Sequence, residues 1–230
     1  MKPAYRLVLS ALASLLMAAA PTDALRLEPL RDAIITDARA ADPATIAFDR
    51  TTTAVRRGPG MKEKTVTVER WDGQRWSLVS VNAKTPSATQ LKQFRKATTA
   101  NPVPGYHRLA ALMAAASDIS VDGEGRKILR IPVLPPGTVR TESADISAHL
   151  SGEAVIAAAD GRPYVARLKV KARENFKLSL LIRVTNFEQI SDYRLGPDGR
   201  PRLASQTADS RGNMFGFSGG QTDEVVYAYR

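Results

Sequence analysis

Two successive runs within residues 164–184 place apolar side chains at every second position, and this alternation constrains the fold more than any other feature of the chain. Side chains of a β-strand point alternately to the two faces of a sheet, so a period of two predicts strands with one apolar and one polar face. The polar tripeptide Arg173-Glu174-Asn175 between the runs has hairpin length, which predicts antiparallel pairing. The predicted apolar face includes Leu168, Val170, Phe176, Leu178, Leu180, Ile182 and Val184.

A second hairpin is predicted over residues 65–81, where Asp72-Gly73 supplies the turn. Trp71 and Trp76 flank this turn, so they either pack on each other across the hairpin or stack on a ligand. Further short alternating runs separated by Gly and Pro turns bring the expected number of strands to about ten. No segment repeats at a fixed period, which argues against a propeller or solenoid.

Two helices are predicted in mid-chain, at residues 86–97 and 106–116. Thr85-Pro86 is a typical helix start, and Leu91 and Phe94 follow at helical spacing. Helices with apolar faces pack on a sheet and shield its apolar side from water. The expected fold is therefore mainly β with two short mid-chain helices, an α+β arrangement in which helices form a lid on a curved antiparallel sheet or an unclosed β-barrel. Residues 45–230 are expected to form a single β-rich domain.

The N-terminus is typical of a secretory signal peptide. Lys2 and Arg6 precede an apolar run of about 14 residues, which is shorter than the roughly 20 needed to span a bilayer, and small residues follow. Residues 1–24 are therefore expected to be removed, and the mature protein is expected in the periplasm. Residues 25–44 are interpreted as a poorly ordered leader, because Pro29 interrupts any helix there. The chain has no cysteine, which excludes disulfides, a thiol nucleophile and a lipid anchor.

The formal net charge is +10. Nucleic acid is an unexpected partner for an exported protein, whereas an anionic membrane surface offers available counter-charge. By parity, Arg167, Lys169 and Lys171 share the polar face of the sheet. These cations are either a membrane-binding surface or simply the solvated side of the sheet.

No motif of the sequence indicates a reaction, a metal or a cofactor. His107 and His149 lack partners at metal-ligand spacing, and the serines lack the strand-to-helix elbow of hydrolases. Asp145 and His149 are four residues apart and would share a strand face without touching. A hydrolase would require His149 or a nearby serine, but a surface histidine is the simpler interpretation.

The plan resembles the periplasmic lipoprotein carriers of the LolA/LolB-like fold family. In that family helices form a lid on an unclosed antiparallel barrel, and the resemblance implies a cavity for acyl chains between them. It spans residues 45–229, although no ligand-binding residue of the family can be placed on a specific position. The residues that carry it are Glu69-Arg70-Trp71-Asp72-Gly73, the helix at 86–97, Asp160-Gly161-Arg162-Pro163, the paired runs at 164–184 and Tyr193-Arg194-Leu195-Gly196-Pro197-Asp198-Gly199.

Two non-catalytic functions follow. The first is a periplasmic binding protein that holds a lipid or a lipoprotein acyl chain between the sheet and the helices. The second is an envelope interaction or sensor protein that acts through its basic face and binds no ligand. The residues expected to contact an apolar ligand are Trp71, Trp76, Phe94, Leu168, Val170, Phe176, Leu178, Leu180, Ile182 and Val184.

Overall fold

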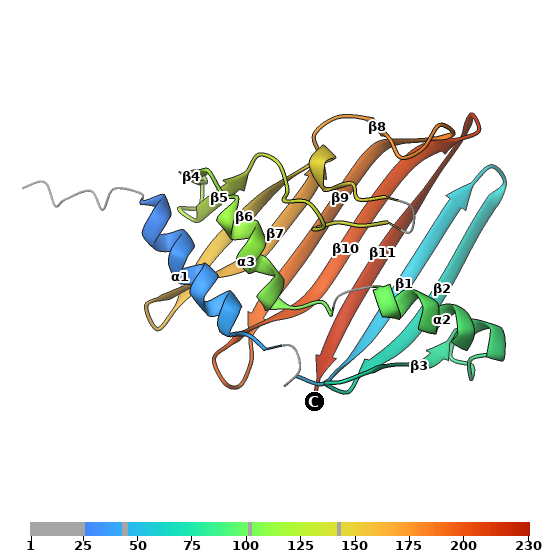
Figure 1. Ribbon diagram of the computed structural model, residues 1–230, viewed down its shortest axis with the longest axis horizontal. Coiled ribbons are helices and arrows are strands. Elements are labelled where there is room, and N and C mark those ends of the chain that lie inside the picture. Colours follow the sequence, from blue (N-terminus) through green and yellow to red (C-terminus); the bar gives the residue numbers. More distant parts are fainter. Residues whose placement is uncertain (1–25, 43–45, 101–102, 142–143) are drawn as a thin grey trace, which may run out of the picture.

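The computed structural model describes residues 26–42, 46–100, 103–141 and 144–230. Its centre is one antiparallel sheet of 11 strands that is not closed into a barrel (Figure 1). Along the sheet the strands are β3 (Trp76–Val81), β2 (Met61–Trp71), β1 (Phe48–Gly58), β11 (Phe217–Tyr229), β10 (Pro201–Met214), β9 (Ile182–Leu195), β7 (Arg162–Ala172), β6 (Leu150–Ala159), β5 (Lys127–Ile131) and β4 (Asp118–Val121). The short strand β8 (Phe176–Lys177) pairs with the start of β9.

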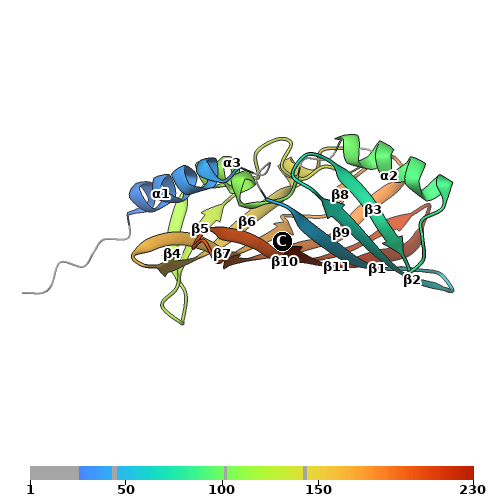
Figure 2. The ribbon, with the colours of Figure 1, turned by 90° about the horizontal axis from the view of Figure 1, so that it is seen from below.

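Three α-helices lie on one face of this sheet, which we call the helix-side face (Figure 2). The helices are α1 (Leu27–Ala40), α2 (Ala88–Ala100) and α3 (Leu109–Ala114), and the 3-10 helices are η2 (Tyr106–Arg108) and η3 (Ser147–His149). Helix α1 packs on α3 and β7, whereas α2 packs on β3 at the other end of the sheet. None of the described helices is long and apolar enough to cross a bilayer. The expected signal peptide at 1–24 lies outside the described residues.

The predicted fold class is confirmed, and so are both mid-chain helices. Helix α2 begins two residues after Pro86, and the second predicted helix is formed by η2 and α3. Leu109, Leu112 and Met113 share the buried side of α3, as their spacing predicts.

The expectation of a poorly ordered leader at 25–44 is wrong for the residues of α1. This helix is 14 residues long and buries Ile34, Ile35 and Ala38. Pro29 is its third residue, and a proline in the first turn of a helix removes no intrahelical hydrogen bond. Pro29 is therefore compatible with the start of α1.

The alternation predicted for residues 164–172 is confirmed only in the second half of β7. Leu168 and Val170 are buried, but so is Val165, which the strict alternation placed on the opposite face. The pairing of β6 with β7 is irregular between Val155 and Ile156, so Ala166 is an extra residue and the side chains switch faces there. The hydroxyl of Tyr106 accepts a hydrogen bond from the backbone N–H of Val165 at 3.0 Å, so η2 is tied to this irregularity.

The predicted hairpin between the two alternating runs is wrong. Strand β7 pairs with residues 188–192 of β9, and not with the run that begins at Phe176. Phe176 instead pairs with Val184, so the second run folds back on itself as a small hairpin of β8 and the start of β9. The length and polarity of 173–175 fit a hairpin turn, but the pairing partner of β7 comes from farther along the chain.

The core lies between the helix-side face and helices α1 and α3. The rings of Tyr106 and Tyr193 meet edge to face with centroids 5.5 Å apart, and Leu109 and Met113 are fully buried beside them. Burial raises the pKa of the Tyr193 hydroxyl well above its usual range, so this phenol is neutral in the folded protein. This half of the helix-side face is largely packed, apart from a cavity of about 330 Å³ beside α3, and a larger open space lies elsewhere on the sheet.

Candidate functional site

A groove of about 980 Å³ lies among the residues of the β1–β2, β8–β9 and β10–β11 turns and the strands that lead to them. Figure 1 shows that these turns lie at one end of the sheet. Its volume is at the upper end of the range typical of small-ligand sites. Among the described residues that line it, the large apolar side chains are those of Met61, Ile146, Phe176, Leu178, Ile182, Val184, Phe187, Phe215 and Phe217.

The floor of the groove has almost no side chains. Gly212 of β10 and Gly219 of β11 are cross-strand partners, and a Cβ atom at Gly219 would lie 4.0 Å from the Cα of Gly58 on β1. All three glycines line the groove. A Cβ at Gly212 would clash with the carbonyl oxygen of Arg183, and one at Gly219 would lie 3.0 Å from that of Arg57, so close backbone approach favours glycine at these two positions, whereas Gly58 has room for a side chain.

The wall of the groove comes from the small hairpin that replaced the predicted long one. Phe176 is 4 % exposed, whereas Leu178, Ile182 and Val184 are half-buried and face the open space. Phe187 is on the helix-side face as well. It lies at every second position along β9 with Gln189, Ser191 and the buried Tyr193, and such residues share one face of a strand. The irregular pairing of β9 with β10 near Gly212 breaks the regular ladder beside this wall.

Four arginines line the same groove: Arg56, Arg57, Arg183 and Arg211. No Asp or Glu is among the described residues that line it. Arg56 donates a hydrogen bond to Gln221 and Arg57 donates one to Thr222, which are neutral partners, and Arg211 pairs with Asp209 at 3.0 Å. Within the described part of the chain no carboxylate pairs with Arg56, Arg57 or Arg183. By the strand registers, Arg56 lies on the same face as Gly58, Gly212 and Val184, whereas Arg57, Arg183 and Arg211 are at the alternate positions and project from the opposite face. The groove is therefore apolar inside, with Arg56 on its own face and three arginines at its edge.

The other face of the sheet carries the basic residues that the sequence singled out, and much of their charge is compensated. Arg167 pairs with Asp192 at 2.6 Å, and Lys169 pairs with Glu188 at 2.9 Å. Both carboxylates come from β9, the true neighbour of β7. Exposed pairs of this kind add little stability, but they reduce the net charge that this face offers to a partner.

Four of the ten predicted ligand-contacting residues meet in the groove: Phe176, Leu178, Ile182 and Val184. Leu168 and Val170 are 4 % and 3 % exposed and border a separate, smaller cavity of about 330 Å³ beside α3. Leu180 is 97 % exposed in the turn between β8 and β9, so its predicted place in the middle of an apolar strand face is wrong.

Trp71 and Trp76 pack on each other with ring centroids 5.6 Å apart, as a cross-strand pair would. Trp76 also meets Phe48 edge to face and lies under the guanidinium of Arg50. Trp71 is ten residues from Met61 along β2, which corresponds to roughly 33 Å at the rise of a strand. The tryptophans therefore form an aromatic cluster at the end of β2 opposite to the groove.

The predicted helical lid does not cover the groove. Among the residues whose side chains are described, none of α2 or α3 lines it, and Phe94 lies half-buried on α2, which packs on β3. Thr141 and Ile146 approach the groove from the irregular segment before η3 instead. Helices α1 and α3 pack over the core, and α2 packs on the far end of the sheet.

Sequence reasoning missed the glycine floor, the arginines and the aromatic residues at the β10–β11 turn. Gly219 and Gly220 both lie within β11. Phe215 and Phe217 on either side of Gly216 were a usable signal, because apolar residues seldom flank an exposed turn without a functional reason.

The residues considered for acid–base chemistry do not form a pair. Asp145 accepts hydrogen bonds from Ser147 and from the backbone of Gly137, and these lower the pKa of its carboxyl group. His149 ends the 3-10 helix η3, so the predicted strand over these residues is wrong. Among the described residues no group of three or more His, Asp or Glu could hold a metal ion.

Comparisons with protein-family models, with curated proteins and with solved structures found no match to this chain.

Proposed function

We propose that this chain is a non-catalytic binding protein for an anionic amphiphile, such as a fatty acid, a phospholipid or a lipoprotein acyl chain. The observation that carries the proposal is the composition of the groove. Its inner surface is apolar, three glycines lie in its floor, Arg56 lies on its face with three further arginines at its edge, and no carboxylate is among the described residues that line it.

The separation of apolar and cationic groups within the groove supports an amphiphilic ligand over a fully apolar one. An acyl chain gains free energy by displacing water from Leu178, Ile182, Val184 and Phe187. A carboxylate or phosphate gains charge-assisted hydrogen bonds from guanidinium groups, which form bidentate contacts with both. Arg56 bonds only the neutral side chain of Gln221, so an anion can replace that partner without breaking an ion pair.

The N-terminal segment and the resemblance to lipoprotein carriers support a periplasmic place for this binding. The alternative, an interaction protein that uses the basic face of β7, has less support, because Arg167 and Lys169 are paired with carboxylates of β9.

The test is a fluorescence titration of the mature protein with cis-parinaric acid and with its neutral methyl ester. The acid should bind at least about tenfold more tightly, a difference of about 1.4 kcal/mol, and Arg56→Gln/Arg183→Gln should abolish most of that preference. Lys169→Gln/Lys171→Gln removes the same charge from the opposite face and should leave the preference unchanged. Equal affinity for the acid and the ester would refute the anionic head group, and no binding of either would refute the carrier.

A further inference from the structure

The most exposed large apolar residues of the described chain gather at the end of the sheet where the groove opens. Ten large apolar residues of the described chain are exposed, and the five that are more than half exposed lie in the three turns there or directly beside them. We call these five the apolar rim: Met61 at 54 %, Leu180 at 97 %, Leu181 at 54 %, Phe215 at 64 % and Phe217 at 65 %. Contiguous exposed apolar residues mark a site of interaction with a protein or a membrane.

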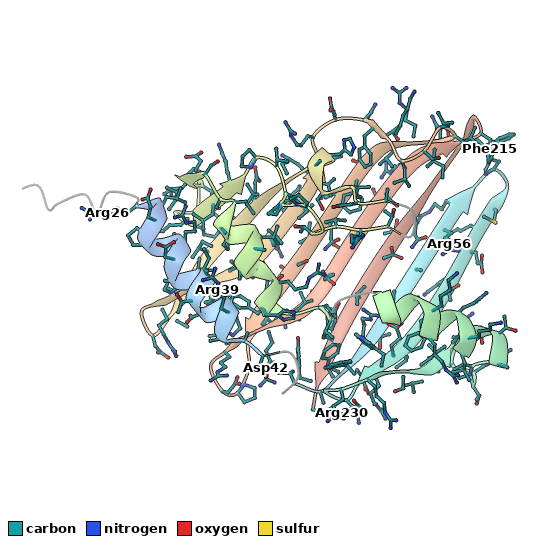
Figure 3. All side chains as sticks on the ribbon, in the orientation of Figure 1. Arg26, Arg39, Asp42, Arg56, Phe215 and Arg230 are labelled. Carbon is teal, nitrogen blue, oxygen red and sulfur yellow. The ribbon has the colours of Figure 1, made fainter. Side chains whose placement is uncertain are left out.

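The apolar rim is held together by the backbone. The N–H of Phe215 donates a hydrogen bond to the carbonyl oxygen of Leu181 at 3.1 Å, which joins the β10–β11 turn to the β8–β9 turn. Figure 3 shows Phe215 at the outermost tip of the sheet, with Arg56 on the same half of the sheet. Leu181 and Phe215 are thus fixed side by side and do not depend on mobile side chains to meet.

The conformation of Phe215 indicates that this position serves something other than the fold. Phe215 and Gly216 both have positive φ, at 53° and 85°, in the two-residue turn between β10 and β11. Such turns favour Asn-Gly, and a bulky residue in the left-handed region is strained. A phenylalanine that is 64 % exposed offsets little of that strain by packing. Strain of this kind is typical of functional sites.

The charges around the apolar rim are mainly positive. Within three residues of its five positions the sequence has Lys62, Lys64, Lys177 and Arg183, but a single acid, Glu63. The groove behind it adds three more arginines, one of them paired with Asp209. A second copy of this edge would bring like charges together, whereas an anionic lipid surface complements them.

We propose that the apolar rim docks on the surface of an anionic lipid bilayer, with the mouth of the groove facing the lipid. Leucine and phenylalanine side chains at two turns, and Met61 at the third, can enter the interface between head groups and acyl chains, and the flanking cations contact the head groups. A fluid surface needs no shape complementarity, which suits tips that come from three separate turns. If the protein docks on a bilayer, the bilayer is the source of its ligand. This conclusion rests on the proposed function, whereas the docking itself rests on the exposed residues.

The experiment is co-sedimentation of the mature protein with vesicles of phosphatidylglycerol and phosphatidylcholine, and with vesicles of phosphatidylcholine alone. The protein should bind the anionic vesicles more tightly, and salt should weaken the binding. Leu180→Ser/Leu181→Ser should lower the partition coefficient at least about tenfold. The matched control, Val121→Ser/Leu195→Ser, removes exposed apolar residues elsewhere and should change nothing.

A second pair of variants locates the charge. Lys62→Gln/Lys177→Gln should weaken binding at low salt, whereas Lys169→Gln/Lys171→Gln, with the same net charge, should not. Leu180 and Leu181 do not line the groove, so their variant should bind cis-parinaric acid in solution as the unmodified protein does. Parinaric acid binding thus reports on the proposed function separately from docking.

Three results would overturn the docking proposal. One is a failure of the unmodified protein to bind anionic vesicles. Another is equal vesicle binding by the Leu180→Ser/Leu181→Ser variant. The third is a concentration-dependent dimer in solution that this variant abolishes, which would make a second copy of the chain the occupant of the apolar rim.

Discussion

His149 and Phe176 stack face to face, with ring centroids 4.4 Å apart and planes 1° from parallel. This contact joins η3 to β8 and holds the most deeply buried side chain of the groove wall in place. His149 therefore acts as a packing residue beside the site, which is a simpler role than the catalytic one that the sequence left open.

Replacing His149 by alanine should loosen this wall. We expect His149→Ala to lower the affinity for cis-parinaric acid about three- to tenfold, in line with the roughly 0.5–1.5 kcal/mol of an aromatic pair. His149→Phe keeps a ring in the stack and should retain nearly full affinity. If His149→Phe lost as much affinity as His149→Ala, the imidazole itself, and not its stacking, would be the important group.

Truncation of a core leucine and of a leucine at a turn tip should have different effects on the free energy of unfolding. Leu168 is 4 % exposed, so Leu168→Ala should lower the free energy of unfolding by about 2 to 5 kcal/mol. Leu180 is 97 % exposed, and Leu180→Ala should change it by less than about 0.5 kcal/mol. Urea denaturation measures both. A core-sized loss at Leu180 would mean that the β8–β9 turn packs against the protein in solution.

Relieving the strained turn should stabilise the protein and weaken its membrane contact. Asparagine tolerates the left-handed conformation of Phe215, so Phe215→Asn should raise the free energy of unfolding by about 1 kcal/mol. The same variant should bind anionic vesicles less tightly, because it removes an exposed aromatic ring. A loss of stability would show that Phe215 contributes packing that outweighs its strain.

The protein should lose stability as the pH falls below about 6.5. Burial, and secondarily the charge of Arg108, lower the pKa of His107 below its usual value of 6.5, although Asp42 and the Val103 carbonyl act in the opposite direction. The unfolded chain then binds a proton that the folded chain resists, which favours unfolding in acid until the folded His107 also titrates. His107→Gln should flatten this slope in urea denaturation between about pH 7 and about pH 5.5. An unchanged slope would assign the acid sensitivity to another group.

Local sequence signals predicted the elements well where the structure depends on local chemistry. Asp160-Gly161 turns the chain between β6 and β7 with positive φ at both residues, as the dipeptide predicts. The face of α3 follows from the spacing of Leu109, Leu112 and Met113. Each of these features is determined within a few residues.

Features that depend on non-local pairing were not predictable in the same way. The alternation from Phe176 to Val184 is the same whether the run pairs with β7 or folds back on itself, so the pattern alone could not reveal that Leu180 lies in a turn. The extra residue at Ala166 likewise leaves no mark in the sequence. Pro29 could mark either the interruption or the first turn of a helix, and the choice depended on the residue at which α1 begins.

The groove was hidden for a related reason. Three glycines, Gly58, Gly212 and Gly219, lie in its floor. Gly212 and Gly219 meet across the β10–β11 hairpin, but Gly58 is far away in the sequence and joins them only because β1 lies beside β11. Glycine is commoner in turns than within strands, so these positions carried no signal of a groove. A sequence pattern readily indicates which residues fill the interior of a fold. It indicates much less well where a cavity or groove remains.

The most direct test of the account is to fill the floor of the groove and measure ligand binding. A Cβ at Gly58 would meet only the Cε of Met61, at 3.7 Å, so Gly58→Leu places a branched side chain in the hollow without a backbone clash. Gly123→Leu is the matched control, because a Cβ there meets nothing within 4 Å and the residue does not line the groove. We predict that Gly58→Leu lowers the affinity for cis-parinaric acid at least about tenfold with little change in stability, while Gly123→Leu binds normally. Unchanged affinity in a folded Gly58→Leu protein would contradict the account, because the ligand would then lie outside the groove.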